Sequence, residues 1–562
     1  MKVNASPWSL WLRALTADRR LQTLPLILGW IAVGGLIVAA AVVRLQIPPV
    51  ALAEHDSWGW LSPALNWIGG LGFYENFERE WLYGAFIAFC LRVTGSFVGY
   101  ILIQQVLGLA AAVFMWLTWR RWLSLFPQNF WWELICTPVG LFLIALFLFN
   151  PTVLVLELAI RPEAIMAFVT FLQLYCVVSY CKFRWHRFHL TRCILFGAFC
   201  LPLAWAMFVL KPNWALAVPA TIFPVLLGTF FGAAPRLARW LPLLAGLALI
   251  GLTLWLPGKL LFHRSAETRV VLPMTLFTIH ADIIRDSMTS EINDPTLAPD
   301  RREFLAKFLP ELSRELQVAV DTNKYYRTLG FDPDYLMYRS SIFPKLENYW
   351  KMSPKDLAAF CRQNFLSAIL HHPSAYARKV ITQLKIFLFP DDRTFFRKRI
   401  SLDGLCLHAA STIPAVANPA YNPKTQSLVQ IYLDRVRQEG TVPRDIKVVP
   451  RFRKFLKAAG PLSPVIGFAF LFSLAASLTW TPLAALRLPG LVALLIFSAP
   501  AGNALTVAMV HSLDNSRYRG SYGPLLLFAL GAMVCFVVAT AVTAAISLWK
   551  NRLRNANPRT SE

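Results

Sequence analysis

Long apolar segments separated by short polar connections make up most of the chain, and one long polar stretch interrupts them after residue 257. A membrane-spanning helix needs about 20 consecutive apolar residues. Ten segments reach or approach this length, and we predict a membrane-spanning helix in each. They lie at residues 22–44, 94–118, 134–150, 164–181, 193–210, 214–231, 240–257, 462–480, 488–510 and 524–548. The pattern predicts an all-α polytopic membrane protein with about seven helices in residues 1–257 and about three in residues 462–562.

The stretch between these two modules, residues 258–461, has a different pattern. Apolar residues recur at helical spacing in several places, for example at Phe304, Phe308, Leu312 and Leu316, whereas the alternation typical of strands is rare. About 200 residues are enough to bury a core of their own. We therefore predict a mainly helical insertion.

Basic residues mark alternate connections between the predicted helices, which sets the orientation of the chain. Loops rich in Lys and Arg stay in the cytoplasm. Both termini are then cytoplasmic, and the first loop, residues 45–93, and the insertion lie outside. The clusters are Lys2, Arg13, Arg19 and Arg20 before the first helix, Arg120 and Arg121 after the second, Lys182, Arg184, Arg187 and Arg192 after the fourth, Arg236 and Arg239 after the sixth, and Lys550, Arg552, Arg554 and Arg559 after the tenth.

Composition supports this interpretation and limits the partners of the protein. Hydrophobic residues make up 56% of the 562 positions and charged residues 15%, whereas soluble domains carry about 25% charged residues. The net charge of +24 would suggest nucleic acid in a soluble protein. Here much of the positive charge lies in short loops beside apolar helices, so we expect membrane lipids as partners and no nucleic acid.

The nine cysteines show no metal-ligand spacing, and most lie in apolar segments. Cys361 and Cys406 both fall in the insertion. Outside the cytoplasm these two thiols could form a disulfide or remain free.

Polar residues that could carry chemistry gather in the connections predicted to face outward. The cytoplasmic loops offer positive charge without matching acids. This asymmetry predicts an extracytoplasmic site. The outward residues are Glu54, His55, Asp56, Arg79, Arg161, Glu163, Lys211, Asn213, His511, Arg517 and Tyr518.

Asp56 is the candidate general base among them. A carboxylate in a cleft at a membrane face can be tuned by desolvation to accept a proton from an attacking hydroxyl. Spacing alone fits equally well a solvated loop charge, with Trp58 and Trp60 as anchors at the membrane interface. His55 could hold a divalent metal together with Asp56, although no further ligand lies at suitable spacing. No cofactor is otherwise indicated.

Two cations at helix ends are candidates for binding a phosphate. Lys211 ends the fifth helix beside Pro212 and Asn213, and Arg517 precedes the last helix next to Tyr518. Basic groups at such ends suit an anionic headgroup, but a snorkelling lysine or an interfacial Arg–Tyr pair would look the same.

Other charged residues have simpler explanations. Arg161 and Glu163 could pair with each other at the mouth of the fourth helix, and Arg92 and Glu157 could be structural partners. Asp332-Pro333-Asp334 has the form of a nucleotide-sugar motif, but without a surrounding α/β pattern it predicts a turn.

Several short motifs, taken in order, resemble the GT-C superfamily of membrane glycosyltransferases, in particular its protein O-mannosyltransferase and aminoarabinose-transferase branch. The resemblance covers the first seven helices and the last two. Its motifs are His55-Asp56-Ser57-Trp58-Gly59-Trp60, Arg79-Glu80-Trp81-Leu82-Tyr83-Gly84, Gln104-Gln105 with Gly108, Arg161-Pro162-Glu163, Leu210-Lys211-Pro212-Asn213 and Asp514-Asn515-Ser516-Arg517-Tyr518.

The resemblance implies a sugar donor on a polyprenyl phosphate and an acidic base in the first outward loop. By position, Asp56 would be that base and Glu163 a second acidic residue of the site. Lys211 and Arg517 would hold the phosphate, Tyr518 would line the pocket, and Arg79 and Tyr83 would shape the first loop. Arg161, His55 and His511 complete the candidate substrate-binding set. The chain departs from the family in having Ser57 after Asp56 and in its insertion, which is not a β-trefoil.

These observations lead to one expected function and two rivals. We expect a bacterial inner-membrane glycosyltransferase that transfers a sugar to a lipid, glycan or protein acceptor in the periplasm, with inversion at the anomeric carbon. An O-antigen ligase or polymerase would instead rely on a late loop containing residues such as His371 and His372. A transporter or flippase would show two similar halves and charges near the bilayer midplane, neither of which the sequence displays.

Overall fold

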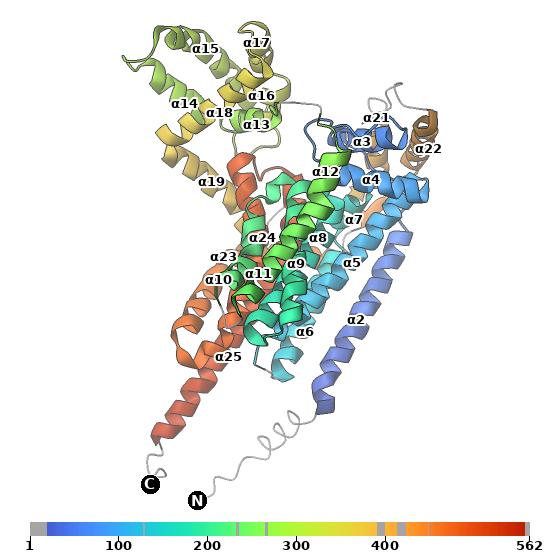
Figure 1. The fold of residues 1–562 in the computed structure, drawn as a ribbon, viewed down its shortest axis with the longest axis vertical. Helices are drawn as coiled ribbons and strands as arrows, with labels where there is room; N and C mark the ends of the chain where they lie inside the picture. Colours follow the sequence, from blue (N-terminus) through green and yellow to red (C-terminus); the bar gives the residue numbers. More distant parts are fainter. Residues whose placement is uncertain are drawn as a thin grey trace, which may run out of the picture.

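The computed structural model describes residues 19–127, 130–231, 235–264, 268–389, 399–412, 423–447 and 449–556, and nearly all of them are helical. A tilted helical bundle carries the remaining elements at one end (Figure 1). The bundle contains α2 (Arg19–Leu45), α5 (Phe97–Leu123), α6 (Phe130–Leu148), α7 (Pro151–Leu158), α8 (Glu163–Cys181), η2 (Lys182–His186), α9 (Leu190–Leu210), η3 (Pro212–Trp214), α10 (Ala217–Phe230), α11 (Arg236–Ile250), η4 (Gly251–Trp255), α12 (Leu256–Leu261), α23 (Pro450–Thr479), η6 (Thr481–Leu486), α24 (Arg487–Val510) and α25 (Ser516–Ala556).

All ten predicted membrane segments are helical, but fewer are long enough to cross a bilayer singly. Within the described residues, eight helical stretches are long and apolar enough, or nine if the pair α6 and α7, bent by 48°, counts as one span. The bend occurs where Asn150 caps α7 by accepting a hydrogen bond from the Thr152 N–H. The helix predicted at residues 214–231 is α10, which has only 14 residues because η3 precedes it.

The bundle is held together by apolar packing and by one sealed ion pair. α8 packs against α5 and α9, and α24 packs against α25. Arg44 at the end of α2 makes two 2.7 Å hydrogen bonds to Glu157 of α7, and both side chains are 2% exposed. The expected partnership of Arg92 with Glu157 is therefore wrong, since Glu157 pairs with a residue that ends a different apolar helix.

The connection between α2 and α5 forms a small helical layer over the end of the bundle. It contains η1 (His55–Ser57), α3 (Trp58–Ile68) and α4 (Trp81–Thr94). Trp60 is buried, with its ring 5.9 Å from that of Tyr83. The interpretation of Trp60 as an interfacial anchor is therefore wrong, because its ring fills the core between α3 and α4.

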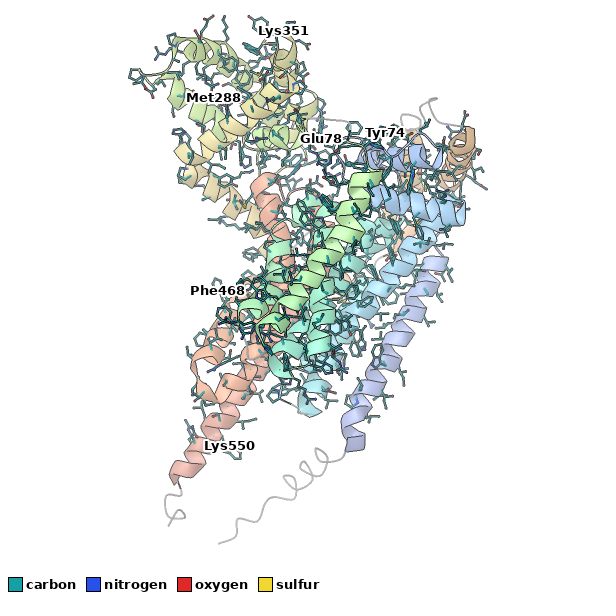
Figure 2. All side chains as sticks on the ribbon, in the orientation of Figure 1. Tyr74, Glu78, Met288, Lys351, Phe468 and Lys550 are labelled. Atoms are coloured by element: carbon teal, nitrogen blue, oxygen red, sulfur yellow. The ribbon has the colours of Figure 1, made fainter. Side chains whose placement is uncertain are left out.

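The insertion consists of two parts rather than one. The first part, residues 271–388, lies beyond the end of the bundle, where Met288 and Lys351 are labelled (Figures 1 and 2). Residues 277–368 share a core that includes Phe277, Phe308 and Leu312, as the helical spacing predicts. Its helices are α13 (Val271–Ile279), α14 (Ala281–Ile292), α15 (Pro299–Asp321), α16 (Pro333–Tyr338), α17 (Ile342–Asn348), α18 (Pro354–His371) and α19 (Pro373–Leu388).

The second part of the insertion joins the core of the bundle and packs beside α3 and α4 (Figure 1). Strand β1 (Arg399–Ser401) pairs antiparallel with β2 (Asp445–Lys447), and α21 (Leu402–Thr412) packs against α22 (Pro423–Gly440). The Tyr432 hydroxyl donates a 2.5 Å hydrogen bond to the Ala51 carbonyl. Cys361 and Cys406 belong to different parts, and both are free buried thiols, so they do not form the disulfide that the sequence allowed.

Candidate functional site: a charged cluster at one end of the bundle

The segment that follows α2 and the segment that follows α7 are joined by backbone hydrogen bonds. The Leu52 N–H donates to the Leu158 carbonyl at 2.7 Å, and the Ile160 N–H donates to the Leu52 carbonyl at 3.0 Å. Two residues beyond this bridge, Glu54 forms an ion pair with Arg161. The expected pairing of Arg161 with Glu163 is therefore wrong, because the bridge places Glu54 beside Arg161.

Asp56 lies in η1 and faces two guanidinium groups. It forms an ion pair with Arg517 at the start of α25, and its Oδ1 atom lies 3.4 Å from Nη2 of Arg79. Burial raises the pKa of Asp56, but Arg517 and Arg79 outweigh burial and hold the pKa below its ordinary value. Asp56 is therefore ionised and paired with two arginines in the structure.

Arg79 reaches Asp56 because the neighbouring residues leave it room. Its guanidinium carbon lies 4.9 Å from the centre of the Trp60 ring, a favourable position for a cation over an aromatic face. A Cβ atom on Gly59 would come within 2.6 Å of the Arg79 side chain. The glycine between Trp58 and Trp60 thus permits the close approach of Arg79 to η1.

Glu163 and Lys211 form a further ion pair of the site. Oε1 of Glu163, the first residue of α8, lies 2.5 Å from Nζ of Lys211, which follows α9. The Glu163 side chain is 2% exposed and that of Lys211 12%. Lys211 is therefore paired with a buried carboxylate, and it is not a lysine that snorkels freely into water.

The Tyr518 ring lies between the Glu163–Lys211 and Asp56–Arg517 ion pairs. Nζ of Lys211 lies 5.1 Å from the centre of its ring and the guanidinium carbon of Arg517 lies 5.4 Å from it. The ring of His511 lies 5.0 Å away. Burial, followed by the charge of Arg517, lowers the pKa of His511 to about 3, so this imidazole is neutral near pH 7.

His55 lies at the edge of this cluster. Its side chain is exposed, and its ring stands edge-on to that of His408 in α21, with 5.9 Å between the ring centres. In the part of the chain that the structure describes, no group of three or more His, Cys, Asp or Glu residues could hold a metal ion.

The first part of the insertion covers the cluster, which the sequence did not indicate. Asp514, in the loop that leads to Arg517, accepts hydrogen bonds from the N–H groups of Thr328 and Leu329. Asp332 caps α16, as the predicted turn suggests, whereas Asp334 accepts a 2.6 Å hydrogen bond from the Tyr326 hydroxyl. The sequence signal for this contact is the position of Asp514 in the same motif as Arg517, which shows that Asp514 lies near the site but not what it binds.

A second contact with the insertion involves the loop that carries Arg79. Glu78 accepts hydrogen bonds from the N–H groups of Val270 and Val271 at the start of α13. Arg269 pairs with Glu75 and Glu80 on either side. Phe77 and Glu78 both have positive φ angles, 49° and 54°, and Glu78 is labelled where the loop meets the insertion (Figure 2). The loop around Arg79 thus takes its shape together with the insertion.

Most of the predicted site residues meet in this cluster. Ion pairs and ring contacts link Asp56, Glu163, Lys211, Arg517, Tyr518, Arg79 and His511. Arg161, which pairs with Glu54, lies within Coulombic range of Glu163 and Arg517. His371 lies outside it, since its ring bonds to Ser367 within α18. A search against protein-family models, curated proteins and solved structures finds no match for this chain.

Proposed function

We propose that the protein is a membrane glycosyltransferase of the GT-C type, which takes a sugar from a polyprenyl phosphate and transfers it to a lipid, glycan or protein acceptor outside the bacterial inner membrane. The observation that supports this most strongly is the ion pair of Asp56 with Arg517 beside the Lys211–Glu163 pair. A carboxylate and several cations at the end of an apolar bundle are the groups that such a transfer needs.

The donor phosphate would bind by taking over the cations. Arg517 and Lys211 flank Tyr518, so a phosphate placed over this ring can receive hydrogen bonds from both. Charge-assisted hydrogen bonds to phosphate are strong, and Arg can form two in parallel. Because Arg517 cannot serve phosphate and Asp56 fully at once, donor binding would release the carboxylate.

This release would activate Asp56 as a base. The pKa of Asp56 is held down by Arg517 and Arg79, and a carboxylate with a low pKa is a weak base. When the phosphate neutralises Arg517, the pKa of Asp56 rises. The carboxylate then becomes a stronger base only when the donor is in place.

The transfer itself would be a single displacement. The acceptor oxygen forms a bond to the anomeric carbon while its proton passes to Asp56. The bond from the anomeric carbon to the phosphate oxygen breaks, and its electron pair stays on the departing polyprenyl phosphate. Lys211 and Arg517 stabilise that charge, and Glu163 positions Lys211. Inversion follows from one displacement.

Replacing Asp56 tests the proposal. Asp56→Asn is expected to lower transfer from undecaprenyl-phosphate sugars by ~10²–10⁴-fold, the contribution typical of a general base. Binding of undecaprenyl phosphate should be retained or become tighter, because the variant no longer competes for Arg517.

Two matched variants make this test specific. Asp300→Asn changes an exposed carboxylate of the insertion and should transfer normally. His371→Ala separates the proposed enzyme from a ligase that uses the late loop, and it too should be active. Undiminished transfer by Asp56→Asn, with normal expression, would refute the role of Asp56.

A further inference from the structure

The loop before α16 is fixed to the loop that precedes α25. The Asp514 carboxylate accepts from the Thr328 N–H at 3.1 Å and from the Leu329 N–H at 2.9 Å. Gln383 of α19 accepts from the Leu513 N–H at 2.7 Å. The two Asp514 bonds join residues 186 and 185 positions apart in the chain, and the Gln383 bond joins residues 130 positions apart. They hold α16 directly over the charged cluster.

This seating turns one face of α16 toward the cluster. Asp334 lies within Coulombic range of Arg517 and Asp56, and Tyr338 within range of Asp56 and Arg79. The ring of Tyr326, which donates to Asp334, lies 6.4 Å from that of His511. The insertion therefore adds a carboxylate and two tyrosines opposite Asp56.

Asp334 differs from the other acidic residues of the site in its partners. Glu54, Asp56 and Glu163 each form an ion pair with a cation. Among the described residues, the Asp334 side chain accepts from the Tyr326 hydroxyl and has no cation within ion-pair distance. A carboxylate has about four acceptor positions, so an exposed carboxylate with one hydroxyl partner retains capacity for a ligand.

Tyr338 lies beside Asp334 on the same short helix. It is the last residue of α16 and is 72% exposed. An exposed aromatic ring next to a carboxylate that has no cation partner suits a ligand with an apolar face and several hydroxyl groups, which describes a sugar ring. The cations beneath suit the phosphate instead. The α16 side of the site thus offers a carboxylate and an aromatic ring, whereas the bundle side offers cations.

We infer that α16 is the acceptor-binding wall of this site, where Asp334 accepts a hydrogen bond from a hydroxyl of a glycan acceptor and Tyr338 packs against its ring. The inference rests on the proposed function and adds the acceptor class and its binding residues. Asp334 and Tyr338 bind and orient the acceptor, while Asp56 takes the proton.

The test measures donor and acceptor separately. Purified protein is given undecaprenyl phosphate carrying a tritiated hexose or pentose, together with increasing amounts of membranes from cells that lack the protein. Labelled glycan and released sugar are both counted. Asp334→Asn should raise the membrane amount needed for half-maximal labelling by ~10-fold or more, since it loses a hydrogen bond to a charged group. Undecaprenyl phosphate binding should change less than about twofold.

Further variants make the result interpretable. Tyr338→Ala removes an exposed side chain, so it should fold normally and also raise the half-maximal amount. Asp300→Asn should behave as wild type. If Asp334→Asn and Tyr338→Ala both need the same membrane amount as wild type for half-maximal labelling, with transfer intact, the inference is overturned but the proposed function is not. A wild-type protein that transfers no label and does not bind undecaprenyl phosphate overturns both.

Discussion

Two arginine–carboxylate pairs in this protein have the same chemistry and opposite surroundings. Arg44 and Glu157 are each 2% exposed and share two hydrogen bonds inside the bundle. Asp56 and Arg517 are 31% and 28% exposed, and a second arginine, Arg79, approaches the same carboxylate. The sealed pair satisfies its own charges, whereas the open pair can exchange a partner with a ligand.

The difference shows what decides the use of an ion pair at a membrane. Removing one partner of a sealed pair leaves an uncompensated charge in an apolar environment, which is costly. Water and ligands reach an open pair, so either partner can be replaced without that penalty. Burial of the pair therefore separates a structural role from a binding role better than the residue types do.

The largest effect is expected at the sealed pair. Glu157→Gln leaves the Arg44 charge without its carboxylate and should destabilise the protein by about 3–5 kcal/mol. Thermal unfolding in detergent measures the loss. The double variant Arg44→Met with Glu157→Leu should recover much of the stability, because neither charge remains. A normal unfolding temperature in Glu157→Gln would contradict the structural role.

At the open pair, a smaller effect should appear in binding rather than in stability. Arg517→Met should weaken undecaprenyl phosphate binding by about 1.5–3 kcal/mol, the usual worth of hydrogen bonds to charged groups. Titration of the purified variant measures this. Arg517→Lys keeps the charge and should lose less. Equal losses of folding stability in Arg517→Met and Glu157→Gln would erase the contrast between the pairs.

The smallest effect is expected from Arg79, as a shift in pH dependence. Burial raises the pKa of Asp56, and Arg79 is one of the cations that reverse this. Arg79→Leu therefore raises the pKa of Asp56, and the ionised base appears only at higher pH. The acidic limb of kcat/KM should move to higher pH, and only by a small amount, because this exposed pair is screened by solvent. A shift to lower pH would contradict the sign.

Apolar runs predicted the positions of the membrane helices because a bilayer demands about 20 apolar residues per span. They could not predict that α10 is short, since its start depends on the local turn of η3. The polar residues of the cluster were also predicted individually, because each lies near the end of an apolar run.

Their pairing could not be predicted from spacing. Arg161 is two residues from Glu163 but pairs with Glu54, because the Leu52–Ile160 backbone bridge aligns the two connections. The sequence around Asp334 predicts only a turn. Its position over the site depends on the contact between Thr328 and Asp514, which lies far away in the chain. Contacts between distant segments depend on packing that local patterns do not contain.

The position of Arg517 in the chain has a consequence for synthesis. It is 461 residues from Asp56 and lies in the first turn of α25, the last helix of the described residues. At about 5–20 residues per second, the ribosome needs roughly 25–90 s to make the intervening chain. During that interval Asp56 has Arg79 as its available cationic partner, and the proposed phosphate site is incomplete. A chain truncated before α25 therefore carries Asp56, the proposed base, without Arg517, the proposed phosphate-binding residue, and synthesis of α25 brings the two together.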